Sequence, residues 1–319
     1  PDLSFRMAQS GGRNRPNNLL SGQNHPNGVI INYYIKNLKD DDYLRIDIEN
    51  KDGSVIRTFS NNQDKYSQIV NNDNNIMIGN PVLSNPNDID NALSSDNLGS
   101  LSPKSGGNRL IWDMRYPGFK SFEGMVLYSS PNVGPKVAPG KYNIKMTYND
   151  QILQKEFEIV KDPRVKISQA DYEDQLEFLI NVRDEVSRAN QKIIDIRNIK
   201  NNMIFISEKT RDNIELQEMI NNYLTDVSEI ENNIHMTKNQ SRQDPLNYGI
   251  RINNRIAFLL ADSQRGDYPP TDQSKEFFIQ VKEELDSEII KLDALIDKHS
   301  QKIENYLEDK KIELISLNN

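Results

Sequence analysis

The residue with the clearest chemical potential is Trp112, the only tryptophan among 319 residues. Arg115, Tyr116, Phe119 and Phe122 follow it closely. Aromatic rings offer flat faces on which a sugar or a partner side chain can stack. These five residues are therefore the candidate ligand or interface surface. The competing and favoured interpretation is that Trp112 anchors the core of a β-sandwich, as single tryptophans do in such folds.

Other side chains suited to chemistry are few. His25, His235 and His299 lack the spacing of a zinc site, and there is no cysteine. The run Asp40–Asp42 lacks the spaced pattern of a calcium loop and is better explained as a solvated turn. No nucleophile elbow, P-loop or dinucleotide fingerprint occurs. We therefore expect no metal, no cofactor and no catalytic residue, although a triad without a motif or a carboxylate pair in a cleft stays open.

Composition limits the classes of function further. The formal net charge is −8, from 39 Lys and Arg against 47 Asp and Glu. Proteins that bind nucleic acid neutralise phosphates with clustered Lys and Arg, so we expect no nucleic-acid partner. No apolar run approaches the roughly 20 residues that cross a bilayer, so we expect no membrane span. The lack of cysteine suits a periplasmic or surface protein.

The elements that would position these residues divide near residue 162. Only two of the 15 glycines, Gly249 and Gly266, lie beyond it, and the acidic excess also belongs to the second half. The composition predicts a disordered linker over 1–24, a β domain over 25–162 and a helical domain over 163–319. A polar insertion over 61–107 is predicted to be a surface excursion.

The β domain is predicted from alternating hydrophobicity. Strands are expected over 29–36 and at Leu44, Ile46 and Ile48, whose polar neighbours should face solvent. Further strands are expected over 55–59, 109–114, 141–148 and 153–160. About seven short strands predict a β-sandwich of fibronectin or immunoglobulin type.

The second half shows helical periodicity. Helices are expected from Ser168, over about 216–230, from Asp244 to Leu260, and from Thr271 onward, which predicts an antiparallel bundle. Arg183 and Asn190 interrupt the apolar seam of the first helix. They are either buried residues that fix the register or residues at the solvent edge. If they are buried, replacing both with Leu is expected to raise stability.

Several strings resemble one bacterial family, in the same order over about residues 25–300. The strings are Asn108–Gly118 (N-R-L-I-W-D-M-R-Y-P-G), Phe122–Met125, Gly134-Pro135, Ala138–Tyr142, His25–Val29, Tyr33-Tyr34, Asp52–Phe59, Val160–Arg164, Gln243–Tyr248, Arg251–Asn254, Gly266-Asp267 and Pro270–Gln273. They resemble the C-terminal region of Bacteroidetes-type sortilin-like, BNR-repeat β-propeller proteins, often labelled glycosyl hydrolases. The insertion over 61–107 is longer here than in that family pattern.

The resemblance implies an accessory role. In that family a propeller precedes this region and any hydrolase label attaches to the propeller, whose repeat does not occur in this sequence. The resemblance thus implies a non-enzymatic module in the periplasm or at the cell surface. Its expected partners are the upstream propeller domain and a cell-surface or secretion-system protein, and it carries over no catalytic residue.

Three hypotheses follow. The first is a non-catalytic structural and interaction module. The second is a carbohydrate-binding module of a glycan-degrading system, which would use Trp112 and Tyr116. The third is a hydrolase with an unrecognised carboxylate site. Binding to polysaccharides separates the second hypothesis from the first, and a hydrolase screen tests the third.

Overall fold

A computed structural model describes residues 3–6, 27–61 and 99–312 of the chain. Strands come first and helices follow, so the prediction of a mixed β plus α protein is confirmed. Most of the predicted insertion and most of the predicted linker fall on residues outside the described part. The surface prediction is wrong for the described end of the insertion, because Leu101 is buried in the core and Gly106 and Gly107 belong to strand β5 (Gly106–Trp112). The linker prediction is wrong for Leu3–Arg6, which form strand β1 and pair in parallel with the last strand of the sheet.

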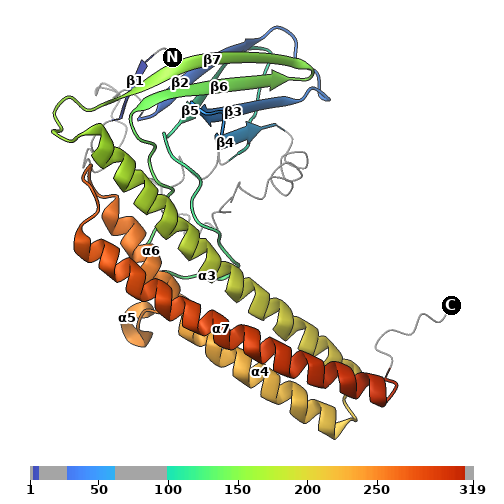
Figure 1. The fold of residues 1–319 in the computed structure, drawn as a ribbon. Helices are drawn as coiled ribbons and strands as arrows, with labels where there is room; N and C mark the ends of the chain where they lie inside the picture. The colour runs from blue at the N-terminus through green and yellow to red at the C-terminus, as the bar shows by residue number, and fades with distance from the viewer. Residues whose placement is uncertain (1–2, 7–26, 62–98, 313–319) are drawn as a thin grey trace. The chain divides into compact units, whose positions relative to one another are not determined.

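Seven described strands form two sheets (Figure 1). The larger sheet has the order β1-β7-β6-β3-β4. Its strands are β1 (Leu3–Arg6), β7 (Gln151–Lys161), β6 (Gly140–Tyr148), β3 (Leu44–Asn50) and β4 (Val55–Ser60). The smaller sheet pairs β2 (Val29–Ile35) with β5 (Gly106–Trp112) in antiparallel register, Val29 opposite Trp112. β6 and β7 are joined by a tight turn in which Asn149 has a φ of 49°.

Both sheets contribute to one hydrophobic cluster. Leu44, Ile46 and Ile48 of β3 are fully buried in it, as their alternation predicts. Their polar neighbours differ from the prediction, because Asp47 is also buried. Its carboxylate accepts hydrogen bonds from Thr58 Oγ1 at 2.6 Å and Arg45 Nε at 2.8 Å, which offset the cost of removing it from water.

The described helices are α3 (Gln169–Lys209), α4 (Ile214–Ile234), α5 (Pro245–Tyr248), α6 (Ile252–Ser263) and α7 (Asp272–Asp309). The single helix expected from Asp244 to Leu260 is wrong, because the chain breaks it at Gly249, whose φ is 79°. None of these helices combines the length and apolarity needed to cross a bilayer.

Contacts between residues divide the chain into two compact units. The sheet unit comprises Pro1–Phe119, Asn132–Arg183 and Leu260–Thr271, and the helical unit comprises Lys120–Pro131, Asp184–Leu259 and Asp272–Asn319. The predicted boundary near residue 162 lies inside the sheet unit. The reason is local: Asp162 is fully buried, and Tyr172 and Gln175 of α3 bond to residues of this same unit.

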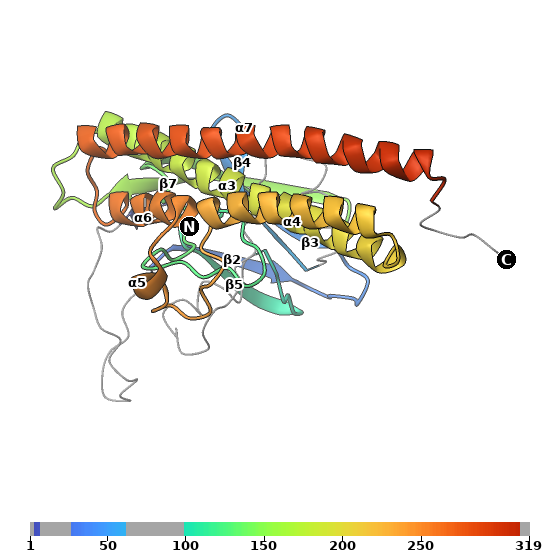
Figure 2. The same ribbon diagram turned by 90° about the horizontal axis from the view of Figure 1, so that it is seen from below.

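Two antiparallel helix pairs build the helical unit. Ser207 of α3 bonds to Gln217 of α4, and Arg197 bonds to Glu231, so these two helices run in opposite directions. α4 and α7 also lie side by side (Figures 1 and 2), with hydrogen bonds that again pair the start of one helix with the end of the other. The apolar face predicted for α4 is buried throughout.

Candidate functional site: a groove on the two-stranded sheet

Trp112 lies in the core and not on a surface. Its side chain is 1% exposed and packs edge-on against Tyr142 and Phe157, with both ring centroids 6.3 Å away. Its indole Nε1 donates to the carbonyl oxygen of Arg115 at 3.0 Å. The indole therefore offers no open face for a sugar, and its position agrees with the core interpretation.

The other four candidate residues are used structurally and are not brought together on one face. Arg115 donates to Gly134 O and to the side chain of Gln264, within the sheet unit. The Tyr116 hydroxyl accepts from Asn50 Nδ2 at 3.3 Å. Phe119 of the sheet unit and Phe122 of the helical unit are both buried.

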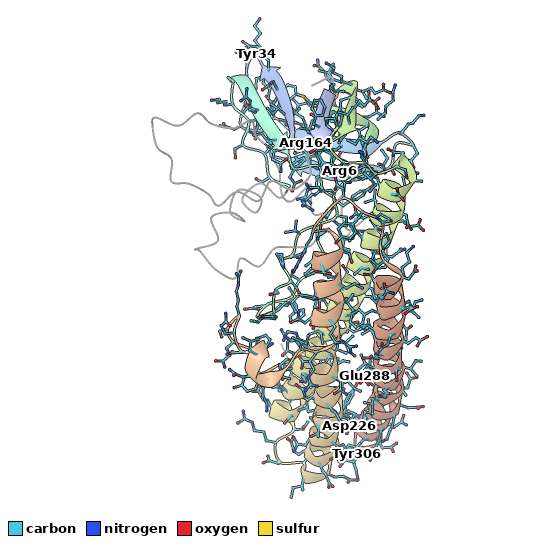
Figure 3. All side chains as sticks on the ribbon, turned by 90° about the vertical axis from the view of Figure 1, so that its left-hand side faces the viewer. Arg6, Tyr34, Arg164, Asp226, Glu288 and Tyr306 are labelled. Carbon is cyan, nitrogen blue, oxygen red and sulfur yellow. The ribbon has the colours of Figure 1, made fainter. Side chains whose placement is uncertain are left out.

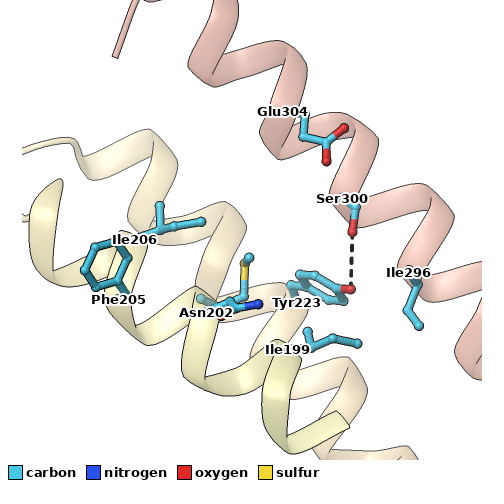
Figure 4. Close-up of a pocket in the computed structure, with 9 residues that line it drawn as sticks. Ile199, Asn202, Phe205, Ile206, Tyr223, Ile296, Ser300 and Glu304 are labelled. Carbon is cyan, nitrogen blue, oxygen red and sulfur yellow. Dashed lines mark hydrogen bonds between the residues drawn. The ribbon is translucent and has the colours of Figure 1, made fainter. Parts of the chain in front are cut away.

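Of the three histidines, His25 lies outside the described residues. The described residues hold no group of three His, Asp or Glu side chains placed to bind a metal ion. His299 Nε2 lies 2.8 Å from Asp226 Oδ2, and the His299 ring stacks on Tyr223. The neighbouring hydroxyl, Ser300 Oγ, lies 3.4 Å from the Tyr223 hydroxyl (Figure 4). This serine is therefore engaged with a tyrosine, and these four side chains serve to join α4 to α7.

A cavity of about 380 Å³ lies beside Tyr223 in the helical unit (Figure 4). Isoleucine, phenylalanine and methionine side chains of α3 form much of its wall, and Glu304 of α7 supplies the one carboxyl group among the described lining residues. A single carboxyl group does not make the acid and base pair of a glycosidase. Its lining is that of an incompletely filled helix junction.

His235 is buried and neutral near physiological pH. Burial lowers its pKa from 6.5 to about 4. Its Nδ1 lies 3.2 Å from Asn253 Nδ2, an amide nitrogen that can only donate, so Nδ1 accepts and carries no proton. Phe122 packs edge-on against the imidazole ring at 4.9 Å.

We expect this histidine to make the helical unit sensitive to acid. The unfolded chain takes up a proton near pH 6.5 and the folded chain only near pH 4, so the stability is complete above pH 6.5 and is lost as the pH falls toward 4. The expected loss at pH 5 is about 2 kcal/mol. Urea unfolding at pH 7.5 and pH 5 measures it. His235→Gln should remove most of this difference and His299→Gln should keep it; an equal pH dependence in both variants would contradict the assignment.

Asp42 in the predicted turn links the loop between β2 and β3 to the end of β6 through hydrogen bonds. Its carboxylate accepts from the Tyr148 hydroxyl, from Asn149 Nδ2 and from the backbone N–H of Lys39. Hydrogen bonds, that of Tyr148 above all, lower the pKa of Asp42 to about 2. The carboxylate is therefore occupied by donors from its own loop between β2 and β3 and from the end of β6 with the turn after it, in agreement with the turn interpretation of Asp40–Asp42.

An open groove of about 770 Å³ lies on β2 and β5 in the sheet unit, and we call it the β2–β5 groove. It is lined by Asn32, Tyr33, Tyr34, Ser102, Lys104, Gly107, Asn108 and Arg109. Pairing of the strands places Asn32 opposite Arg109 and Tyr34 opposite Gly107. The Tyr34 ring is 71% exposed near the end of β2 (Figure 3).

The groove arises from the two-residue period of both strands. Val29, Ile31 and Ile35 turn one face of β2 into the core, so Asn32 and Tyr34 face outward. Arg109 Nε donates to Asn32 Oδ1 at 3.0 Å and fixes the guanidinium across the groove floor. Gly107 has no side chain, which leaves the space beside Tyr34 open.

The chemistry of the groove is that of a polar ligand site. Tyrosine rings supply flat apolar faces, and amide, hydroxyl, ammonium and guanidinium groups supply hydrogen-bond donors and acceptors. The sequence contained the signal, because Asn32 and Tyr34 alternate with core residues. The pairing partner, more than 70 residues away, was needed to assemble it.

Comparison of this chain with family models, with curated proteins and with solved structures found no match.

Proposed function

We propose that this chain is a non-catalytic accessory module that binds an extended, hydroxyl-rich ligand, a glycan chain, in the β2–β5 groove. The observation that carries the proposal is the exposed Tyr34 ring beside the Asn32–Arg109 hydrogen bond, at the end of an open groove. An aromatic face next to planar amide and guanidinium groups suits a sugar ring, whose faces are apolar and whose edge carries hydroxyls.

The lining of the groove favours binding over hydrolysis. The eight described residues that line it include neither a carboxyl group nor a histidine. A glycosidase needs two carboxyl groups about 5–10 Å apart around the scissile bond. Lys104 and Arg109 are positively charged, so acidic or strongly hydrated glycans suit the groove better than apolar ligands.

The resemblance to sortilin-like propeller proteins supports an extracytoplasmic setting for this module. We propose a periplasmic or cell-surface location, an upstream propeller domain as its neighbour, and a surface or secretion-system protein as a further partner. The sheets would form a fibronectin-like or immunoglobulin-like sandwich and the helices an antiparallel bundle. Because Trp112 is buried, the carbohydrate hypothesis rests on Tyr34 instead of on that residue.

Tyr34→Ala is expected to weaken glycan binding about tenfold. Loss of one stacking face removes roughly 1–1.5 kcal/mol, and 1.4 kcal/mol corresponds to a tenfold change in affinity. Binding is measured with soluble oligosaccharides by NMR titration and with insoluble polysaccharides by sedimentation. Tyr248→Ala is the matched control, because Tyr248 is a 48% exposed tyrosine on α5 of the helical unit.

Each outcome bears on the proposal. Binding that Tyr34→Ala weakens and Tyr248→Ala keeps would support a glycan site in the groove. If the wild-type protein binds neither neutral nor acidic polysaccharides, the proposed ligand class is wrong. Equal binding by all three proteins would place the ligand on another surface.

A further inference from the structure

A second polar site lies inside the sheet unit, away from the groove residues. It is a small cavity whose wall includes Arg6, Arg115, Lys136, Gln175, Leu179, Gln264, Arg265, Gly266 and Asp267. Its volume of about 20 Å³ holds one water molecule or one small ion and no organic ligand. We call it the basic cavity.

Positive charge exceeds negative charge around this cavity. Among the described residues of the wall, Arg6, Arg115 and Lys136 face one carboxylate, that of Asp267, and Asp113 also acts on Arg115 and Lys136. Asp267 is already engaged: Arg6 Nη2 donates to it at 3.0 Å and the Tyr172 hydroxyl donates at 3.0 Å. The fourth cation, Arg265, is 63% exposed and lies 3.3 Å from Asp262, so water and that partner balance its charge.

Arg6 is buried with its Nε donor unused. Its side chain is 4% exposed on strand β1 (Figure 3). Nη1 donates to Val137 O at 2.5 Å and Nη2 donates to Gln175 and Asp267. Nε has no hydrogen-bond partner among the described residues. A buried charged donor left without an acceptor is costly, so such a group is usually met by water or an ion.

The electrostatics of Lys136 also favour a negative charge in the cavity. The pKa of its ammonium group is lowered from 10.5 to about 8, first by burial and then by the positive charges of Arg115 and Arg6, while Asp267 and Asp113 oppose the change. Burial likewise lowers the pKa of Arg115. A negative charge in the cavity would reverse both effects and stabilise the folded protein.

We propose that the basic cavity binds one small monovalent inorganic anion of the size of chloride, with Arg6, Arg115 and Lys136 supplying the positive charge. The anion would give Arg6 Nε its missing acceptor and tie β1 to the start of α3 and the segment after α6. This site is independent of the proposed glycan groove.

The test compares the full chain in sodium chloride and in sodium gluconate at an equal ionic strength of about 0.15 M. Gluconate is too large for the cavity. The melting temperature is expected to be about 3 °C higher in chloride. Lys136→Gln should abolish this difference. Lys166→Gln, an equal change of charge at an exposed position of the sheet unit, should keep it.

A second measurement locates the ion. Crystals grown in bromide should show an anomalous peak beside Arg6 Nε, with neither a carboxylate nor a carbonyl oxygen as its nearest neighbour. Equal melting temperatures in the two salts, a difference that survives in Lys136→Gln, or a water without anomalous signal at this position would each overturn the proposal. The crystallographic result decides the matter if Lys136→Gln fails to fold.

Discussion

Trp112→Ala is expected to lower the free energy of unfolding by about 3–5 kcal/mol, the cost of truncating a fully buried aromatic side chain. The substitution removes the ring that contacts both Tyr142 and Phe157, and it leaves a cavity between them. It also takes the indole donor from the carbonyl oxygen of Arg115. For a unit of this size the melting temperature should fall by about 10 °C or more, as thermal unfolding followed by circular dichroism would show.

The adjacent residue supplies a matched control. Ile111 lies on the same strand but faces the other way and is 42% exposed, so Ile111→Ala should cost about 1 kcal/mol or less. Trp112→Phe keeps an aromatic ring without the N–H and should fall between the two. If the Trp112→Ala protein has the same melting temperature as the wild type, the indole is not part of the core.

The strands and helices predicted from the sequence share one physical property: each buries a continuous apolar face. Ile46 and Ile48 on β3 and Tyr223 and Val227 on α4 are buried as their periodicity indicates. Periodicity reports only which face is apolar. It therefore gave the wrong environment for Asp47, whose burial depends on Thr58 across the sheet and on Arg45 of its own strand.

The sequence pattern did not predict elements that are held by polar contacts between residues far apart in the sequence. Strand β1 has only four residues, and its buried side chain is Arg6, which bonds to residues more than 130 positions away. Nothing local marks such a segment as folded. The break of the third expected helix at Gly249 had a local signal, because glycine adopts the positive φ that ends a helix. Pro245 indicates only where this helix begins.

The candidate site could be predicted only in part, because its residues gather from separate strands. The string from Asn108 to Gly118 suggested a functional surface, yet much of it is explained by packing. A Cβ on Gly118 would lie 2.1 Å from Asn132 Oδ1, and one on Gly134 would lie 1.9 Å from Tyr116 O, so both positions require glycine. Asn108 and Arg109 are the residues of this string that line the groove.

Asn190 is the position in the helical unit where we expect the largest effect of one substitution. Arg183 and Asn190, which interrupt the apolar seam of α3, are 9% and 0% exposed, so both are buried. Asn190 Nδ2 donates to Lys120 O at 2.6 Å, and its Oδ1 accepts from Asn253 Nδ2 at 3.1 Å. Asn253 in turn donates to His235. The polar seam position thus belongs to a chain of buried hydrogen bonds.

Because of these hydrogen bonds, we expect a leucine at this position to lower the stability instead of raising it. Buried polar residues without fixed partners cost stability, and their replacement by Leu then raises it. Here Asn190→Leu would strand the carbonyl oxygen of Lys120 and one N–H of Asn253 in the interior. Each stranded group costs about 1–3 kcal/mol, and the additional apolar burial returns about 1 kcal/mol.

We therefore expect Asn190→Leu to lower the free energy of unfolding by about 2–4 kcal/mol. Asn201→Leu makes the same change at an exposed position of the same helix, and its effect should be a few tenths of a kcal/mol. Urea unfolding at pH 7.5 compares the two. A gain in stability for Asn190→Leu would mean that the hydrogen bonds add nothing beyond an apolar contact. The loss that we expect would show that this asparagine joins α3 to the segment after Lys120 and to α6, because only groups on those two elements lose a partner.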